Sequence, residues 1–222
     1  MTPAAVLLDL DGTLVLSEHI HRRVWQRFFD EWRLEVDERD YARSYQGRRA
    51  ADVLDQVRGP WRAEDVPGAL AALHAHTDAE AGNVEVVPGA VELVEELHRR
   101  GRLVAVVTSA SRTWTRRVLD DVLGVGARIP VVVTAEEVET GKPHPEGYLR
   151  ACRRLGVDPA TCAAVEDSEA GVQALVAAGV GTVVGVTTTA PAAQLRSAGA
   201  GATVADLRTP AALTALGFPG PS

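Results

Sequence analysis

The stretch Ala4-Ala5-Val6-Leu7-Leu8, followed by Asp9-Leu10-Asp11-Gly12-Thr13, decides how this chain folds. A short, continuous apolar run is typical of a strand buried on both faces of a parallel sheet. Asp9 and Asp11 are two residues apart, so in extended backbone their carboxylates point the same way. Two close anions need a cation, and oxygen-rich sites suit Mg²⁺. The pair predicts either an acidic turn bent at Gly12, or a site where one carboxylate attacks phosphorus and the other acts as acid and base.

A helical segment interrupts the chain directly after this strand. From Glu18 to Leu34 the apolar residues recur at helical spacing, and further helices are expected at 37–45, 48–57 and 63–81. Glycine and proline separate these stretches, and no strand is expected between Ser17 and Asn83. The pattern predicts an all-helical unit.

After Pro88-Gly89 the pattern changes to strands that alternate with helices, which indicates a parallel sheet covered on both faces. The expected strands are 103–107, 131–133, 162–165 and 182–186, the expected helices are 90–100, 112–123, 145–155 and 169–178, and a last short helix and strand fall within 192–204. We therefore predict an α/β fold with a Rossmann-like core of residues 1–16 and 84–222 and a helical domain of residues 17–83. The two crossings between them could act as a hinge.

Composition excludes several classes of partner. The chain has 222 residues, a net charge of −7 and a pI of about 5.4, which argues against a nucleic-acid or anionic-membrane surface. No apolar run approaches the roughly 20 residues that span a bilayer, and the first residues lack the basic flank of a secretion signal. We expect a cytoplasmic protein, a monomer or a weak dimer. Cys152 and Cys162 lack the spacing of a disulfide or metal framework.

Lys142 is the single lysine among 23 basic residues. It lies in Gly141-Lys142-Pro143-His144-Pro145, between residues that restrict the backbone. Because an ammonium and a guanidinium are not interchangeable at a crowded site, this exception suggests a chemical role. An ammonium there could bridge an aspartate and a phosphate oxygen; the alternative is chance at a surface turn.

Two further polar signals follow expected strands. Thr108, Ser109 and Ala110 could bind phosphate through hydroxyls and backbone N–H groups, and Glu166 with Asp167 offers two more carboxylates for a metal. Taken alone, helix capping explains the Glu166-Asp167 signal equally well, and it is the favoured explanation of the Thr108 segment. Ligands bind at the carboxyl ends of parallel strands, so the fold would bring these residues to one edge beside Asp9, Asp11 and Lys142.

In these motifs the chain resembles phosphatases of the haloacid dehalogenase superfamily with a helical cap of the C1 type, and most closely sugar- and polyol-phosphate phosphatases and β-phosphoglucomutase-like hydrolases. Asp9-Leu10-Asp11-Gly12-Thr13-Leu14 matches the first family motif, and Thr108/Ser109 the second. Lys142 in Gly-Lys-Pro-x-Pro matches the third, and Glu166-Asp167-Ser168 the fourth. The resemblance covers nearly the whole chain in the right order, although Leu16 stands where many relatives have an acidic hinge residue.

The resemblance implies a role for each motif. Asp9 would be the nucleophile that forms an aspartyl-phosphate, and Asp11 the acid and base. Mg²⁺ would be held by Asp9, the backbone carbonyl of Asp11 and Asp167, with Glu166 binding it directly or supporting its ligands. Lys142 and the Thr108–Ala110 segment would hold the phosphate oxygens, and the sequence leaves open which of the two hydroxyls does so.

The helical domain would select the substrate, a small phosphorylated metabolite such as a sugar or polyol phosphate. Candidate residues are His21, Gln46, Gly47, Arg48 and Arg49, each of which could instead be an ordinary surface residue. The main alternative is a phosphosugar mutase of the β-phosphoglucomutase type, which is disfavoured because the helical domain has no lysine and Ala50 replaces an arginine. A haloacid dehalogenase would not need Asp11, and a non-catalytic binding protein would not need to keep Asp9, Asp11 and Lys142.

Overall fold

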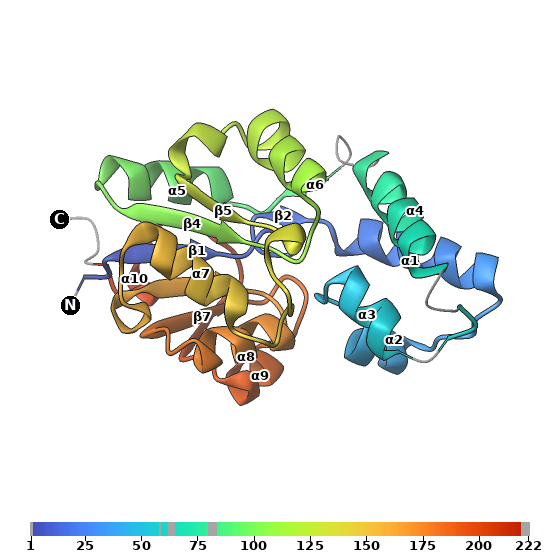
Figure 1. The fold of residues 1–222 in the computed structure, drawn as a ribbon. Coiled ribbons are helices and arrows are strands. Elements are labelled where there is room, and N and C mark those ends of the chain that lie inside the picture. The colour runs from blue at the N-terminus through green and yellow to red at the C-terminus, as the bar shows by residue number, and fades with distance from the viewer. Residues whose placement is uncertain (1, 58, 62–64, 80–83, 219–222) are drawn as a thin grey trace.

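A computed structural model describes residues 2–57, 59–61, 65–79 and 84–218. Within these residues the central element is a six-stranded parallel sheet in the order β5-β4-β1-β6-β7-β8 (Figure 1). The strands are β1 (Ala5–Leu8), β4 (Leu103–Val107), β5 (Val131–Val133), β6 (Ala163–Glu166), β7 (Thr182–Val186) and β8 (Ala202–Val204). The predicted α/β class and Rossmann-like parallel sheet are confirmed.

Strand β1 lies at the centre of the sheet because all four of its residues are apolar and fully buried. Leu7 is paired with Ala105 of β4 on one side and with Ala164 of β6 on the other. Side chains alternate between the two faces of a strand, so Val6 and Leu8 belong to one apolar cluster, and Ala5 and Leu7 to the other.

Helices cover both faces of this sheet. The cluster around Val6 includes residues of α5 (Ala90–Arg99), α6 (Arg112–Arg117) and α10 (Ala211–Ala215). The cluster around Leu7 includes residues of α7 (Glu146–Leu155), α8 (Glu169–Ala177) and α9 (Ala192–Ala198). We call the sheet and these six helices the sheet region. Its helices lie on the two faces of the sheet and not beyond the carboxyl ends of the strands.

Four helices of the described residues lie beyond those carboxyl ends: α1 (Glu18–Trp32), α2 (Glu38–Ser44), α3 (Ala50–Gln56) and α4 (Val66–Ala79) (Figure 1). We call these helices, together with the described residues that connect them, the helical unit. Trp25 of α1 contacts the rings of Phe28 and Phe29 on the same helix, and that of Tyr45 at the end of α2, at centroid distances of 5.5, 5.9 and 5.0 Å.

A short antiparallel ribbon joins the helical unit to the sheet region. Strands β2 (Val15–Leu16) and β3 (Glu85–Val86) pair Val15 with Val86 and Leu16 with Glu85. The sequence did not predict this ribbon, because two-residue strands carry no periodicity. The division of the chain into two domains stays a prediction.

The other differences from the predicted elements are small. The expected helix 112–123 is α-helical only to Arg117 and continues as a π-helical turn at Val118–Val122. Helix α10 was not predicted, and the expected ends of helix 63–81 lie outside the described residues. Among the described residues no helix has the length and apolar character needed to cross a membrane.

Candidate active site

The ammonium group of Lys142 lies between two carboxylates at the end of the sheet. Asp9 directly follows β1, and Glu166 ends β6, the strand paired with β1. Lys142 Nζ is 2.5 Å from Asp9 Oδ1, 2.6 Å from Glu166 Oε1 and 3.3 Å from the carbonyl oxygen of Val107. An ammonium has three N–H donors, and these three acceptors match them. Lys142 is 7% exposed and Asp9 4%, so the ion pairs are shielded from water.

Glu166 is fully buried, and both of its oxygens are occupied. Oε1 accepts hydrogen bonds from Lys142 and from the Tyr148 hydroxyl, and Oε2 accepts from the backbone N–H groups of Asp167 and Ser168 and from the Ser168 hydroxyl. Burial raises the pKa of Glu166, but Lys142 and the Ser168 donors outweigh it and leave the pKa below the usual value. Glu166 therefore stays ionised and orients Lys142 and the turn that follows β6.

The carboxylates of Asp9, Glu166 and Asp167 lie close enough to hold a metal ion, with one oxygen of each within 4.8 Å of the others. Burial raises the pKa of Asp9 to about 7, despite the neighbouring ammonium of Lys142. Burial and the charges of Glu166 and Asp9 raise the pKa of Asp167 well above its usual value. One ammonium does not balance three buried carboxylates, so a divalent cation fits this site.

Glycine at position 12 makes room for Asp167. Gly12 has a φ of +84°, and a Cβ atom there would lie 2.0 Å from Asp167 Oδ2. The glycine thus permits both the left-handed turn after Asp11 and the close approach of the Asp167 carboxylate.

Asp11 turns away from this cluster and is held by different partners. Its Oδ1 accepts hydrogen bonds from the Ser17 hydroxyl at 2.6 Å and the Trp114 indole N–H at 2.9 Å, and it lies 3.0 Å from His21 Nε2. Its Oδ2 lies 3.3 Å from the Thr108 hydroxyl. Burial alone would raise the pKa of Asp11, but His21 and the hydrogen bonds lower it overall. In return Asp11 raises the pKa of His21, against the effect of burial.

The predicted phosphate-binding segment lies at the same edge. Thr108 directly follows β4, and its hydroxyl accepts a hydrogen bond from the Ala110 N–H at 3.0 Å as well as donating to Asp11. The Ser109 hydroxyl instead donates to the carbonyl oxygen of Gly47 in the helical unit, at 3.3 Å. Thr108 is buried, whereas Ser109 and Ala110 are half-buried. The structure thus brings all of the predicted core residues together.

Four of the five candidates in the helical unit also reach this site. His21, Gln46, Gly47 and Arg48 line the pocket that contains Asp9, Asp11 and Lys142. Arg49 points elsewhere and donates hydrogen bonds to the carbonyl oxygens of Ala135 and Val138.

Sequence reasoning missed a set of residues in the wall of the pocket that the helical unit provides. They are Glu18, Trp25, Tyr41, Tyr45, His74 and Thr77. Tyr41 and Tyr45 have the four-residue spacing of an ordinary core-facing stripe, so periodicity alone could not assign them to a site. Trp114 was missed for a related reason, because its buried ring looks like a core residue until its N–H group is placed.

Three relatives with assigned names are similar to this chain over most of its length. It is 37% identical to validoxylamine A 7'-phosphate phosphatase of Streptomyces hygroscopicus subsp. limoneus, over 86% of this chain and 89% of the relative. It is 34% identical to hexitol phosphatase A of Escherichia coli K12, over 78% of each. It is 31% identical to β-phosphoglucomutase of Mycobacterium bovis, over 91% of this chain and 89% of the relative.

The family comparison agrees with the geometry of the site. Residues 3–179 match the family of haloacid dehalogenase-like hydrolases, a range that runs from β1 to the turn after α8 and contains every motif described above. The predicted resemblance and the predicted class of enzyme are confirmed, and the chain belongs to the haloacid dehalogenase-like hydrolase family.

Proposed function

We propose that this protein is a Mg²⁺-dependent phosphatase that hydrolyses the phosphomonoester of a small sugar or polyol through an aspartyl-phosphate on Asp9. The observation that carries the proposal is the position of Lys142 between Asp9 and Glu166, with the carboxylate of Asp167 beside them. A buried carboxylate next to an ammonium and a metal-binding carboxylate is suited to attack an anionic phosphate. The phosphatase names of two relatives support the same reaction.

In the first step a carboxylate oxygen of Asp9 forms a bond to phosphorus while the bond from phosphorus to the alcohol oxygen breaks. The departing oxygen takes a proton from Asp11. In the second step a water molecule attacks phosphorus, Asp11 takes its proton, and the bond from Asp9 to phosphorus breaks to release phosphate. Asp11 therefore works as an acid and then as a base.

Lys142 lowers the pKa of Asp9 against the larger effect of burial, and its ammonium would contact the phosphate oxygens. Its weakest contact, at 3.3 Å to the Val107 carbonyl, is the one that a phosphate oxygen could most easily replace. Asp9, Asp167 and the Asp11 backbone carbonyl would hold Mg²⁺, which when bound neutralises charge on the phosphate. The occupied oxygens of Glu166 favour its role as support for Lys142 over direct binding of the metal.

His21 keeps a proton beside the leaving-group side of the site. Its Nε2 lies 3.0 Å from Asp11, and its raised pKa favours the imidazolium form. When an anionic phosphate binds nearby, its charge favours protonation of Asp11. The pair therefore holds the proton that the departing alcohol oxygen requires.

The lining of the pocket supports a sugar or polyol as the remainder of the substrate. Trp25, Tyr41 and Tyr45 line the pocket and offer apolar surface for C–H groups, and Gln46 and Arg48 offer hydrogen-bond donors for hydroxyl groups. The names of the relatives that act on validoxylamine 7'-phosphate and on hexitol phosphates support this class. We infer that residues 17–83 form a cap domain over this pocket.

A phosphosugar mutase is the second candidate, because one relative is a β-phosphoglucomutase. The helical unit has no lysine, and Ala50 occupies the position of the expected arginine, so the chain lacks the two cations that are expected in that mutase family. Incubation with a sugar 1-phosphate separates the two functions, because a hydrolase releases the free sugar and a mutase forms the 6-phosphate.

Release of phosphate from a panel of phosphorylated sugars, polyols and nucleotides, and from a generic aryl phosphate, tests the proposal. We expect hydrolysis in Mg²⁺ that stops when a chelator is added and returns when Mg²⁺ is restored. Turnover that is unaffected by the chelator would contradict the metal site. A panel in which no sugar or polyol phosphate exceeds the aryl phosphate in kcat/KM would contradict the substrate class.

A further inference from the structure

Arg49 of the helical unit forms hydrogen bonds with the backbone of the segment that precedes Lys142 in the sheet region. Its Nη1 donates to the carbonyl oxygens of Ala135 at 3.2 Å and Val138 at 2.6 Å, and its Nη2 donates to the carbonyl oxygen of Glu139 at 2.5 Å. These partners lie 86 to 90 residues away along the chain, so the contacts join two distant parts of the fold. A guanidinium is suited to this task because its donors are fixed in one plane.

Asp52, in the first turn of α3, completes the contact. One of its oxygens pairs with Arg49 Nη2, and the other accepts a hydrogen bond from the Gly141 N–H at 2.9 Å. The side chains of Arg49 and Asp52 are 14% and 11% exposed, so the pair is largely shielded from solvent. A Cβ atom at position 141 would lie 2.4 Å from Asp52, which means that this approach requires the glycine.

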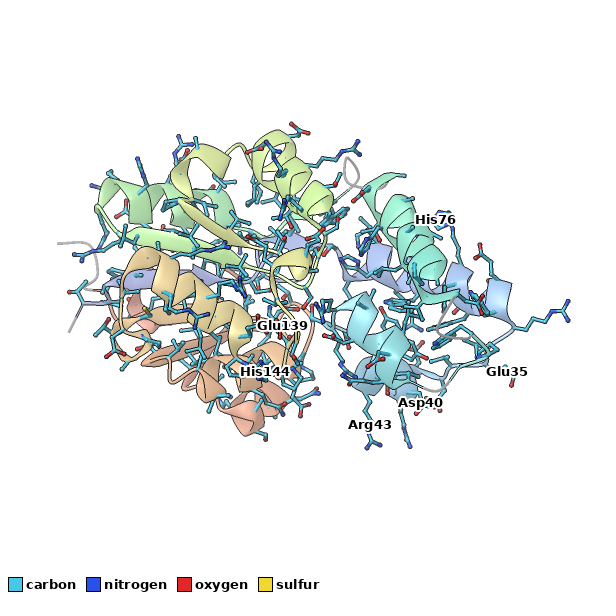
Figure 2. The ribbon with its side chains drawn as sticks, viewed as in Figure 1. Glu35, Asp40, Arg43, His76, Glu139 and His144 are labelled. Atoms are coloured by element: carbon cyan, nitrogen blue, oxygen red, sulfur yellow. The ribbon has the colours of Figure 1, made fainter. Side chains whose placement is uncertain are left out.

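The same segment is fixed on its other side by the sheet region itself. The Glu146 carboxylate, in the first turn of α7, accepts hydrogen bonds from the N–H groups of Glu139 and Thr140, at distances of 3.1 and 3.0 Å respectively. Figure 2 shows Glu139 and His144 on the side of the sheet region that faces the helical unit. Residues 138–141 are therefore held between α7 and α3, and the next residue is Lys142.

We propose that Arg49 and Asp52 are positioning residues, which hold the segment before Lys142 in place when the helical unit is docked on the sheet region. The inference rests on the proposed function, since it assigns Lys142 to the reaction. Neither residue lines the pocket that contains Asp9 and Asp11, whereas the neighbouring Arg48 does. Arg49 borders only a smaller pocket on the other side of Lys142. Arg49 and Asp52 thus act through the backbone at Gly141, and they link the docking of α3 to the position of the ammonium beside Asp9.

Hydrogen exchange and steady-state kinetics of Arg49→Ala test this link. We expect faster exchange of the backbone amides of residues 139–141, and a kcat that falls by about 10-fold or more with little change in KM, because a displaced catalytic group lowers turnover without removing a substrate contact. Arg43→Ala is the matched control, since Arg43 is exposed on the same unit and points away from the sheet region (Figure 2). It should change neither quantity.

Exchange is measured without substrate, so it tests the contact even if the protein proves not to be a phosphatase. Unchanged exchange in Arg49→Ala would overturn the contact, and faster exchange with unchanged kcat would overturn the link to Lys142. A rise in KM alone would instead make Arg49 a substrate contact. The same changes in Arg43→Ala would show that the effect is not specific.

If Arg49→Ala does not fold, Gly141→Ala tests the same contact by a change in the sheet region. Its added methyl group collides with Asp52, so we expect a similar fall in kcat. In an Asp52→Ala background the collision is absent, and the additional loss caused by Gly141→Ala should be at least about 3-fold smaller, as expected for residues in contact. Equal losses in both backgrounds would overturn the proposed contact.

Discussion

Asp9 and Asp11 are two residues apart, yet the molecule places them in opposite electrostatic surroundings. Asp9 faces a cluster built entirely by the sheet region, where burial raises its pKa to about 7. Asp11 faces a cluster to which the helical unit contributes His21, and its pKa is lowered. Burial is the largest influence on both carboxyl groups and acts in the same direction, so their neighbours make the difference.

The difference indicates that the two aspartates of this short motif have different chemical roles. The Asp9 cluster has an excess of carboxylates and is suited to a metal ion, whereas the Asp11 cluster has a histidine and three neutral donors and is suited to the exchange of protons. Only the second cluster includes a side chain of the helical unit, His21. Variants on the two sides should therefore fail in different ways.

The largest effect is expected from Asp9→Asn. An amide cannot form the aspartyl-phosphate, so kcat should fall by on the order of 10⁴-fold or more, as for other nucleophile deletions. Phosphate release and a thermal unfolding curve measure activity and folding together. Asp55→Asn, at an exposed position of α3, should keep full activity. A folded Asp9→Asn protein with normal turnover would remove Asp9 from the mechanism.

Lys142→Arg should follow, with kcat lower by about 100-fold, similar to the loss of one charge-stabilising donor. The charge is kept, but a planar guanidinium cannot direct its donors to Asp9, Glu166 and the Val107 carbonyl from the position of the ammonium. Kinetics with the same substrate measure the loss. Near-normal turnover would show that any cation is sufficient on the Asp9 side.

His21→Ala should lower kcat by about 10-fold, because it removes a partner that orients the proton-transferring group rather than the group itself. His19→Ala, an exposed neighbour on α1, is the control. An equal loss in both variants would indicate damage to α1 and not loss of the contact with Asp11.

The same variant has a pH signature in its stability. Because the pKa of His21 is raised in the folded protein, this group adds stability that is fully present below pH 6.5. That stability is lost as the pH rises through the pKa of His21 in the folded state. The lowered pKa of Asp11 adds stability that is present above 3.8 and is lost as pH falls through the folded value. Thermal unfolding should therefore show the largest loss in His21→Ala between these two pH values and a smaller loss near pH 9.

The effect of Mg²⁺ on thermal stability tests the Asp9 cluster. The raised pKa of Asp9 means that its protonated form adds stability below pH 3.8, which is lost as pH rises through about 7. Because a metal binds the deprotonated carboxylates, Mg²⁺ should raise the melting temperature by a few degrees at pH 8 and by less at pH 5. An equal rise at both pH values would contradict metal binding by Asp9 and Asp167.

Trp114→Phe should have the smallest effect, about 3-fold in kcat, since it removes one of several hydrogen bonds to Asp11 and keeps most of the ring packing. Trp32→Phe, in the helical unit and away from Asp11, serves as the comparison for ring substitution. Activity unchanged by Trp114→Phe would show that Ser17 and His21 hold Asp11 without the indole.

The sheet region was predictable because its signals are local. A strand, a turn and a polar residue lie together in the sequence at Asp9, Thr108 and Glu166, and parallel strands necessarily bring their carboxyl ends to one edge. The pocket wall in the helical unit was not predictable, because tyrosines at core spacing give no sign of what lies opposite. Arg48 and Arg49 show the limit: adjacent arginines were treated alike, yet one lines the pocket and the other holds the backbone before Gly141.

Because β2 and β3 are paired, we expect that the helical unit can be exchanged for that of a relative. Its outgoing and returning strands are paired at Val15–Val86 and Leu16–Glu85, so the sheet region needs only a matching pair of neighbouring ends, whatever lies between them. Joining two adjacent points costs an entropy that grows only slowly with the length of the inserted chain. If the helical unit of a relative is joined at these two residue pairs, we therefore expect the sheet region still to fold. Such an exchange should change substrate selectivity and leave the catalytic residues of the sheet region in place.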